Sequence, residues 1–237
     1  TAYSTNLAVS DPVNFESDLS RNQQESDFKT ERSEIIAKVK AGTGIRLEKE
    51  FTPLLGNEFA IVTTRYREKI AIIQVKDGSK MRTLLTNLSN MKSDNTGQFN
   101  YEKLPQILLG DAFSVFKRPY FKVMDNYLVL TNSTSELISY DDSYANRKFL
   151  NRTDGYSQFD ALLAERSNVS FFVQFKNVQA LFKQDLKPAF YDAFENTIPG
   201  WKNFYAAAWQ FTSSDKNYYT NFCMRLGLDT AGTNTAF

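Results

Sequence analysis

The sequence has no histidine and a single cysteine, Cys223, among its 237 residues. The absence of histidine removes the side chain that most often serves as a general base at neutral pH and as a metal ligand. It also removes the common nucleophile–base pairs that depend on histidine. A single cysteine excludes a disulfide bond within the chain. We therefore expect a protein that is not an enzyme, with no catalytic residues, no metal site and no cofactor.

Long hydrophobic runs and an excess of either charge are also absent. No apolar stretch approaches about 18 residues, the length of a helix that spans a bilayer. The net charge is +1, whereas proteins that bind nucleic acid usually carry a basic excess on one face. We expect no nucleic-acid partner, and membrane association only through an anchor outside this chain.

The first residue is Thr1 and not an initiator methionine. We expect a fragment of a longer protein, preceded by an export signal or an anchor. The scarcity of cysteine and histidine suits an oxidising compartment such as the bacterial periplasm, although a cytosolic protein can have the same composition. The expected location is exported, in the periplasm or cell envelope.

Aromatic residues are abundant, with 20 Phe, 12 Tyr and 2 Trp. This content argues against a disordered chain, and a chain of this length can build a core without disulfides or metals. We expect a single domain over residues 1–237, with flexible ends at 1–10 and 229–237.

Hydrophobic periodicity predicts hairpins that alternate with helices. The expected helices cover residues 25–40, 79–91, 155–166, 177–186 and 188–197, with shorter ones after Asp11-Pro12, over 47–55 and after Ser133. The expected strands cover 58–64, 69–75, 119–124, 127–131, 168–175, 203–212 and 217–228. Because the strands come as hairpins and not singly between helices, the prediction is an α+β fold, with a mainly antiparallel sheet and helices packed on it.

The order strand, turn, strand, helix occurs twice in this prediction, roughly 60 residues apart. We infer two related lobes, about 25–110 and 111–230. Local signals mark several boundaries. Gly42-Thr43-Gly44 ends a helix, Asp125-Asn126 suits a two-residue turn, and Ser133 with Glu136 forms a capping box. Residues 92–103 are expected to be a polar loop.

Two adjacent motifs have catalytic residue types at the wrong spacing. Residues 89–92 match SxxK and residues 93–95 match SDN, elements that penicillin-recognising enzymes hold far apart in sequence. Here they abut and no KTG is present, so they cannot face each other across a cleft. We interpret them as a helix end that runs into a polar loop.

Paired carboxylates could act without histidine, as they do in glycosidases. Asp141 and Asp142 are neighbours on a predicted helix, where successive side chains point about 100° apart, so they do not share a site. Other pairs, such as Asp154 or Asp160 with Glu165, would need tertiary approach. A carboxylate-dependent carbohydrate-active enzyme is the alternative hypothesis, and a structural spacer is a third.

Aromatic residues crowd the C-terminal hairpin. Strand alternation places Phe204, Ala206 and Ala208 on one face with Gln210. The other face then carries Tyr205, Ala207, Trp209 and Phe211. Two interpretations stay open: a central strand covered on both sides, or a groove that binds an apolar ligand or a partner segment.

Several short segments, taken together, resemble an uncharacterised bacterial envelope family, a domain of unknown function. Residues 41–45 lead through 54–58 into the strand 59–62. Residues 120–131 contain the D-x-Y-L-V-L element, which precedes a serine-capped helix at 133–137. The resemblance covers roughly residues 30–180 and continues through Phe149-Leu150, Phe159 and Phe171–Phe175. It implies an N-terminal membrane anchor, exposure outside the inner membrane and no catalytic residues.

We therefore predict a non-catalytic, exported domain that binds a protein, peptide or small apolar ligand beside the C-terminal hairpin. The predicted binding residues are Tyr205, Trp209, Tyr218 and Tyr219.

Overall fold

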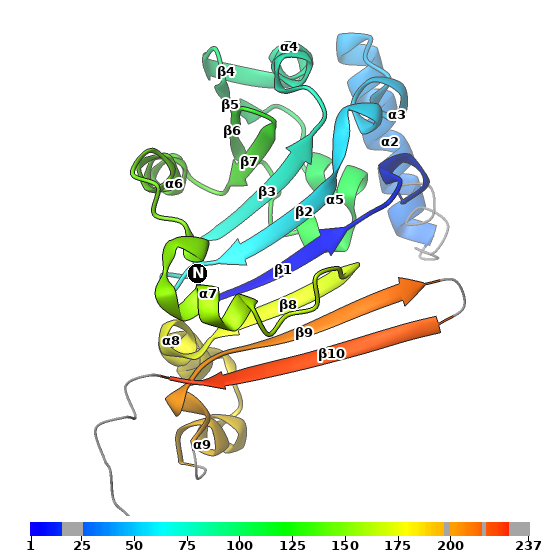
Figure 1. Cartoon of the computed structure of the whole chain (residues 1–237). Coiled ribbons are helices and arrows are strands. Elements are labelled where there is room, and N and C mark those ends of the chain that lie inside the picture. The colour runs from blue at the N-terminus through cyan, green and yellow to red at the C-terminus, as the bar shows by residue number, and fades with distance from the viewer. Residues whose placement is uncertain (16–25, 197–199, 215–216, 228–237) are drawn as a thin grey trace, which may run out of the picture. The chain divides into compact units, whose positions relative to one another are not determined.

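The structure, a computed structural model, describes residues 1–15, 26–196, 200–214 and 217–227 (Figure 1). The fold is α+β with mainly antiparallel strands, as the sequence predicts. The chain divides into two compact units. Unit 1 holds residues 1–7, 62–68 and 142–237, and unit 2 holds residues 8–61 and 69–141.

Unit 2 contains strands in the hydrogen-bonded order β2-β3-β7-β6-β5-β4. The pairs β3–β7, β6–β7, β5–β6 and β4–β5 are antiparallel. Ile73 on β3 and Val129 on β7 are fully buried, which explains why these strands are continuous apolar runs. The bounds are β2 (Leu55–Thr63), β3 (Lys69–Val75), β4 (Ser89–Ser93), β5 (Thr96–Phe99), β6 (Tyr120–Met124) and β7 (Tyr127–Thr131).

The prediction of a polar loop over residues 92–103 is wrong for the first half of this range, because residues 89–99 form the β4–β5 hairpin. The helix expected over 79–91 accordingly ends at Leu88. Gly97 lies opposite Phe121 of β6, and a Cβ at Gly97 would lie 2.9 Å from that ring. The hairpin therefore depends on a tertiary contact, which local periodicity does not report.

The helices of unit 2 largely follow the predictions, although the short buried helix α5 was not predicted. Gly44 has a φ of +77° beyond the end of α2 and donates its N–H to the Lys40 carbonyl. The capping box is confirmed, because Ser133 and Glu136 exchange side chain–backbone hydrogen bonds of 3.2 Å in both directions. The bounds are α2 (Ser26–Thr43), α3 (Leu47–Glu50), α4 (Gly78–Leu88), α5 (Leu104–Leu109) and α6 (Thr134–Ala145), which continues into unit 1.

In the described part of unit 1, the strands follow the order β1-β8-β9-β10, each antiparallel to its neighbour (Figure 1). The prediction that residues 1–10 are flexible is wrong, because residues 3–8 form β1 and pair with β8. Asn6 donates a side-chain hydrogen bond of 3.2 Å to Ser170 across this pair. The second predicted flexible end, 229–237, lies outside the described residues. The bounds are β1 (Tyr3–Ala8), β8 (Val169–Gln174), β9 (Phe204–Ser214) and β10 (Asn217–Leu226).

The helices of unit 1 are α7 (Asp154–Asp160), α8 (Phe175–Asp185) and α9 (Pro188–Asn196). The two segments with the order strand, turn, strand, helix are present as β2-β3-α4 and β6-β7-α6. The compact units are nevertheless interleaved along the chain, and their bounds differ from those of the consecutive lobes at 25–110 and 111–230.

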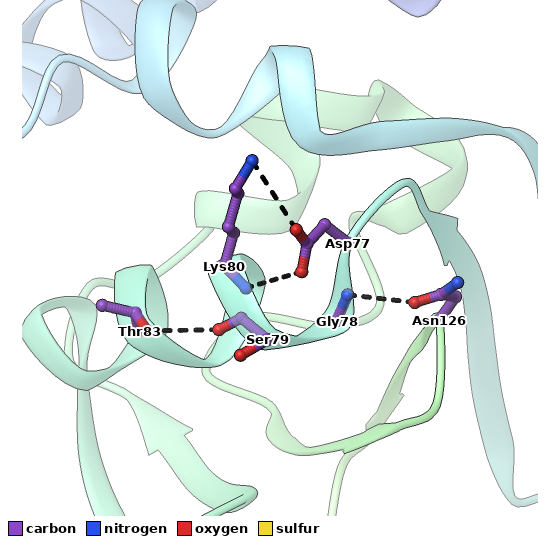
Figure 2. Close-up of polar contacts among 6 residues, drawn as sticks. All are labelled: Asp77, Gly78, Ser79, Lys80, Thr83 and Asn126. Carbon is purple, nitrogen blue, oxygen red and sulfur yellow. Dashed lines mark hydrogen bonds and ion pairs between the residues drawn. The ribbon is translucent and has the colours of Figure 1, made fainter.

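The start of α4 is held against the β6–β7 turn (Figure 2). Asp77 caps the helix by accepting a 3.0 Å hydrogen bond from the Lys80 N–H. The Gly78 N–H donates to the Asn126 side chain at 3.1 Å, and Asp125 adopts the positive φ expected of this turn. A Cβ at Gly78 would lie 1.9 Å from the Asp125 carbonyl oxygen. Only glycine fits there without a shift of the backbone.

We predict that Gly78→Ala lowers the free energy of unfolding by about 2 kcal/mol, because the new methyl group forces the turn away from the helix. Alanine is the better helix former, so propensity alone would predict the opposite sign. Denaturant unfolding of the variant is compared with that of Ser79→Ala, an exposed control in the same turn. A Gly78→Ala variant as stable as the control would contradict this packing.

A second prediction concerns acid stability. The Lys80 backbone N–H holds the pKa of Asp77 below its usual value. Ionised Asp77 therefore stabilises the fold above about pH 4, and this contribution is lost as the pH falls through the lower folded-state pKa. Asn at position 77 keeps the cap but does not titrate. The free energy of unfolding, measured with urea from about pH 6 to about pH 2, should fall less for Asp77→Asn than for wild type. Equal losses in the two proteins would refute the stabilising role of ionised Asp77.

Candidate functional site

The strand registers of unit 1 assign each side chain to one of two sheet faces, because directly paired residues point the same way. Phe171 lies opposite Trp209, and Trp209 lies opposite Phe222. The Trp209 face carries Phe171, Ala207, Trp209, Phe211, Phe222 and Met224. The Ala208 face carries Phe172, Ala206, Ala208, Gln210 and Cys223.

Helices α8 and α9 cover one part of the Trp209 face. The small side chain of Ala207 is fully buried and lets the helices approach the strands closely. Trp209 and Met224 are partly buried at the border of this cluster. Its buried members are Ala2, Phe175, Val178, Leu181, Phe194 and Ala207.

Further along the strands, the same face carries exposed aromatic side chains. We define the aromatic surface as Phe171, Trp209, Phe211, Tyr218 and Phe222. The exposed fractions are 86% for Tyr218, 47% for Phe222 and 41% for both Phe171 and Phe211. The ring centroids of Trp209 and Phe222 are 4.7 Å apart, and those of Phe171 and Phe211 are 6.2 Å apart. Neighbouring exposed aromatic residues are typical of interaction sites.

A β-bulge shifts the side-chain alternation at the start of β9. Ala206 pairs with Arg225 and Phe204 pairs with Leu226, so Tyr205 is the extra residue. Phe204 packs with Phe175 of α8, whereas Tyr205 packs with Phe159 of α7. Strict alternation therefore assigned Phe204 and Tyr205 to the wrong faces.

Tyr205 is part of the core on the Ala208 face. Its ring centroid lies 6.2 Å from that of Phe159, and a Cβ at Gly155 would lie 2.7 Å from the ring. The Tyr205 hydroxyl is buried and has no hydrogen-bond partner among the described residues. Burial here, together with the nearby Asp160 carboxylate, raises the pKa of Tyr156 to about 12. The Tyr156 phenol is therefore neutral at physiological pH.

The four predicted binding residues do not share one surface. Trp209 and Tyr218 lie on the aromatic surface, with Trp209 half-buried. Tyr219 is 57% exposed but lies opposite Thr212, on the same face as Tyr205. The predicted binding residues did not include Phe171, Phe211 and Phe222. Strand β8 pairs with β9, and this pairing places Phe171 beside Trp209. The order of strands in the sheet cannot be read from the sequence, so the sequence did not indicate Phe171.

Gln210 holds the segment after α7 against the Ala208 face. Gln210 is 5% exposed, and its side chain forms two hydrogen bonds with the Ala164 backbone. Its Oε1 accepts from the Ala164 N–H at 2.7 Å, and its Nε2 donates to the Ala164 carbonyl at 2.9 Å. The contact explains why α7 ends at Asp160 and does not continue to 166 as predicted.

Three of the residues considered for chemistry, Asp141, Asp142 and Ser89, are engaged with other groups. Asp141 pairs with Lys122 at 2.5 Å and Asp142 with Lys148 at 3.1 Å, so the two neighbours point to different cations. Ser89 is buried and donates to the Leu85 carbonyl at the end of α4. Within the described residues, no group of three or more acidic or cysteine side chains could hold a metal ion. None of the described helices has both the length and the hydrophobicity needed to cross a membrane.

Comparisons with known proteins add little to this geometry. No family model matches the chain, and none of the curated proteins matches it. Among solved structures, crystal form III of TP0453 aligns with 96% of this chain and 76% of that chain. The TM-score is 0.38 and the sequence identity is 10%. A likeness at this level carries no argument about function.

We predict that Tyr205→Phe leaves the free energy of unfolding unchanged or raises it by up to about 1 kcal/mol, because the variant removes a buried hydroxyl without a partner. Tyr205→Ala, which removes the packed ring as well, should cost about 3 kcal/mol. Urea denaturation measures both. A Tyr205→Phe variant that loses more than about 1 kcal/mol would show that the hydroxyl is hydrogen-bonded.

Proposed function

We propose that this protein is a non-catalytic binding domain of the bacterial cell envelope, and that its aromatic surface binds an apolar segment of a protein or peptide. The single observation that supports the binding role is the exposure of Phe171, Phe211, Tyr218 and Phe222 on the part of the Trp209 face that α8 and α9 do not cover. The envelope location is proposed only on the resemblance of residues 30–180 to an envelope family.

The chemistry of the aromatic surface suits an apolar partner. None of its five members is charged, so an ionic ligand would find no counter-charge on it. Burying aromatic area releases roughly 25 cal/mol per Å², and flat rings contribute this area with little loss of side-chain entropy. Tyr218 adds a hydroxyl that can hydrogen-bond at the rim of a complex. A peptide with apolar side chains on one side meets these requirements.

The alternative of a carboxylate-dependent carbohydrate enzyme has weaker support. Such an enzyme needs two acids about 5–10 Å apart beside the substrate. Asp141 and Asp142 are paired with lysines, and the five residues of the aromatic surface include no acid. Nothing in the described part of the chain favours this alternative over binding.

We predict that Tyr218→Ala and Phe171→Ser each weaken peptide binding by about tenfold or more, because both remove exposed ring area from the surface. Tyr219→Ala is the matched control, since Tyr219 is the next residue on β10 and points to the opposite face. The probes are peptides selected from a random display library against the wild-type chain, and their affinities are measured by calorimetry.

Circular dichroism must first show that each variant is folded. The proposal is wrong if the library yields no binder to the wild-type chain. It is also wrong if Tyr219→Ala weakens binding as much as Tyr218→Ala does. Trp209 is not used in this test, because its half-buried ring also packs on the core under α8 and α9.

A further inference from the structure

Strand β10 is a long edge strand that carries little charge. It ends the strand order of unit 1 within the described residues (Figure 1). Natural edge strands are usually short, charged or interrupted by proline, which prevents pairing with other segments. The edge strand of unit 2, β4, fits this rule with five residues that include Lys92. β10 has ten residues and one charged side chain, Arg225, so its edge lacks the usual protection against an added strand.

The hydrogen bonds of the sheet show which residues of β10 face the open edge. The Gln174 N–H donates to the Ala2 carbonyl, so even-numbered residues of β8 face β1 and odd-numbered residues face β9. The registers of β8 with β9 and of β9 with β10 carry this alternation outward. At the end of β10, the Gly227 N–H donates to the Asn203 carbonyl on the β9 side. The open-edge residues, whose backbone N–H and C=O groups point away from β9, are therefore Tyr218, Thr220, Phe222, Met224 and Leu226.

The open-edge residues also carry side chains of the aromatic surface. Because Phe222 lies opposite Trp209, all five open-edge residues point their side chains to the Trp209 face. Leu226, like Tyr218 and Phe222, is exposed. A segment paired with β10 would therefore meet mainly apolar side chains on this face and mainly polar side chains on the other. The residues of β10 on the other face are Asn217, Tyr219, Asn221, Cys223 and Arg225.

We propose that the apolar partner of the aromatic surface binds as an extended strand added antiparallel to β10, with apolar side chains at every second position. This inference rests on the proposed function and deepens it, because it states the backbone conformation and the residue pattern of the partner. Addition of a peptide strand to a sheet edge is a general mode of recognition. Main-chain hydrogen bonds supply its affinity, and alternate side chains supply its specificity.

The geometry of the sheet favours an extended partner. An added strand would lie about 4.8 Å from β10 and continue the spacing of the sheet. Its residues opposite Tyr218 and Phe222 would exchange N–H and C=O groups with them and would place their own side chains on the Trp209 face. The same pairing thus uses the open backbone groups and the exposed rings together, whereas a helix on the aromatic surface would use the rings alone.

Arg225 indicates where the partner carries an acidic side chain. Its guanidinium donates to the Gly155 carbonyl and to the Gln158 side chain, and because both acceptors are uncharged, these bonds leave its positive charge uncompensated. The backbone of Arg225 faces β9, so an added strand meets this residue at a non-hydrogen-bonded position, where opposite side chains are close. An Asp or Glu there forms a favourable cross-strand charge pair. Since the strands are antiparallel, this acid precedes the apolar residues of the partner in sequence.

The test uses a capped eight-residue peptide, Glu-Val-Thr-Val-Thr-Val-Ser-Leu, whose first residue lies opposite Arg225 and whose last lies opposite Tyr218. Its fourth residue lies opposite Phe222 and directs its N–H toward β10, whereas the N–H of its fifth residue, opposite Asn221, points to solvent. N-methylation of the fourth residue should weaken binding about tenfold or more, because it removes a hydrogen bond and adds a methyl group at the strand interface. N-methylation of the fifth residue is the matched control and should have little effect. Calorimetry up to millimolar peptide measures the affinities, since a single added strand is a small interface.

Amide hydrogen exchange, followed by nuclear magnetic resonance, reports the same pairing on the protein. The N–H groups of Thr220 and Phe222 should become protected when the peptide binds. The N–H of Asn221 faces β9 in the free chain and should change little. Replacing the Glu of the peptide with Gln should weaken binding about threefold at low salt, and Arg225→Gln should remove this difference between the two peptides.

The proposal is overturned if the designed peptide does not bind, if both N-methylated peptides bind equally, or if Thr220 and Phe222 stay unprotected in the complex. Equal affinity of the wild-type chain for the Glu and Gln peptides would contradict the assigned register. Protection of these amides without peptide, rising with chain concentration, would assign the edge to a second copy and would also overturn the proposal. If library peptides that depend on Tyr218 bind while the designed peptide does not, the proposed function stands and only the strand addition is wrong.

Discussion

The hydrogen-bonded register of β9 between β8 and β10 determines which sheet face each aromatic side chain of unit 1 occupies. Side chains alternate between the two sheet faces along a strand. One extra residue therefore moves every side chain that precedes it on the strand to the opposite face. The bulge at Tyr205 is such a residue. It directs Phe204 to the helices α8 and α9 and Tyr205 to α7, while Trp209 keeps its place beside Phe171 and Phe222.

Three consecutive alanines make this arrangement possible. Ala206, Ala207 and Ala208 are all buried, and their small side chains let helices approach the sheet from both faces. On the Ala208 face, α7 and the segment bonded to Gln210 cover the strands around Ala206 and Ala208. On the Trp209 face, the helices described in unit 1 cover the strands around Ala207. The remaining rings are consequently exposed, and the proposed binding function follows from this incomplete cover.

Much of the fold could be predicted from local signals. The β6–β7 hairpin, the capping box at Ser133 and the C-terminal hairpin all depend on residues close in sequence, and all three are confirmed. The features that the sequence did not predict depend on partners far away in the chain. β1 is a short strand of mixed polarity that is stabilised by β8, more than 150 residues away, and the end of α7 depends on Gln210. Neither contact leaves a periodic pattern in its own segment.

The candidate site was predicted in part for the same reason. The aromatic richness of the hairpin is visible in the sequence, and two of the residues predicted from it, Trp209 and Tyr218, lie on the aromatic surface; their role in binding stays a prediction. The face of Tyr205 could not be known, because a bulge depends on the pairing of two strands and not on one of them. Phe171 belongs to a strand that precedes β9 by two helices, so only the strand order places it on the aromatic surface.

The most direct test of this account is a set of nuclear Overhauser contacts from the ring protons of Tyr205, measured at a concentration where the chain is monomeric. The account predicts contacts with the rings of Phe159 and Tyr156 on the Ala208 face. Contacts of Tyr205 with Phe175 or Phe194 instead would place it under α8 and α9, and the assignment of the aromatic surface would then be wrong.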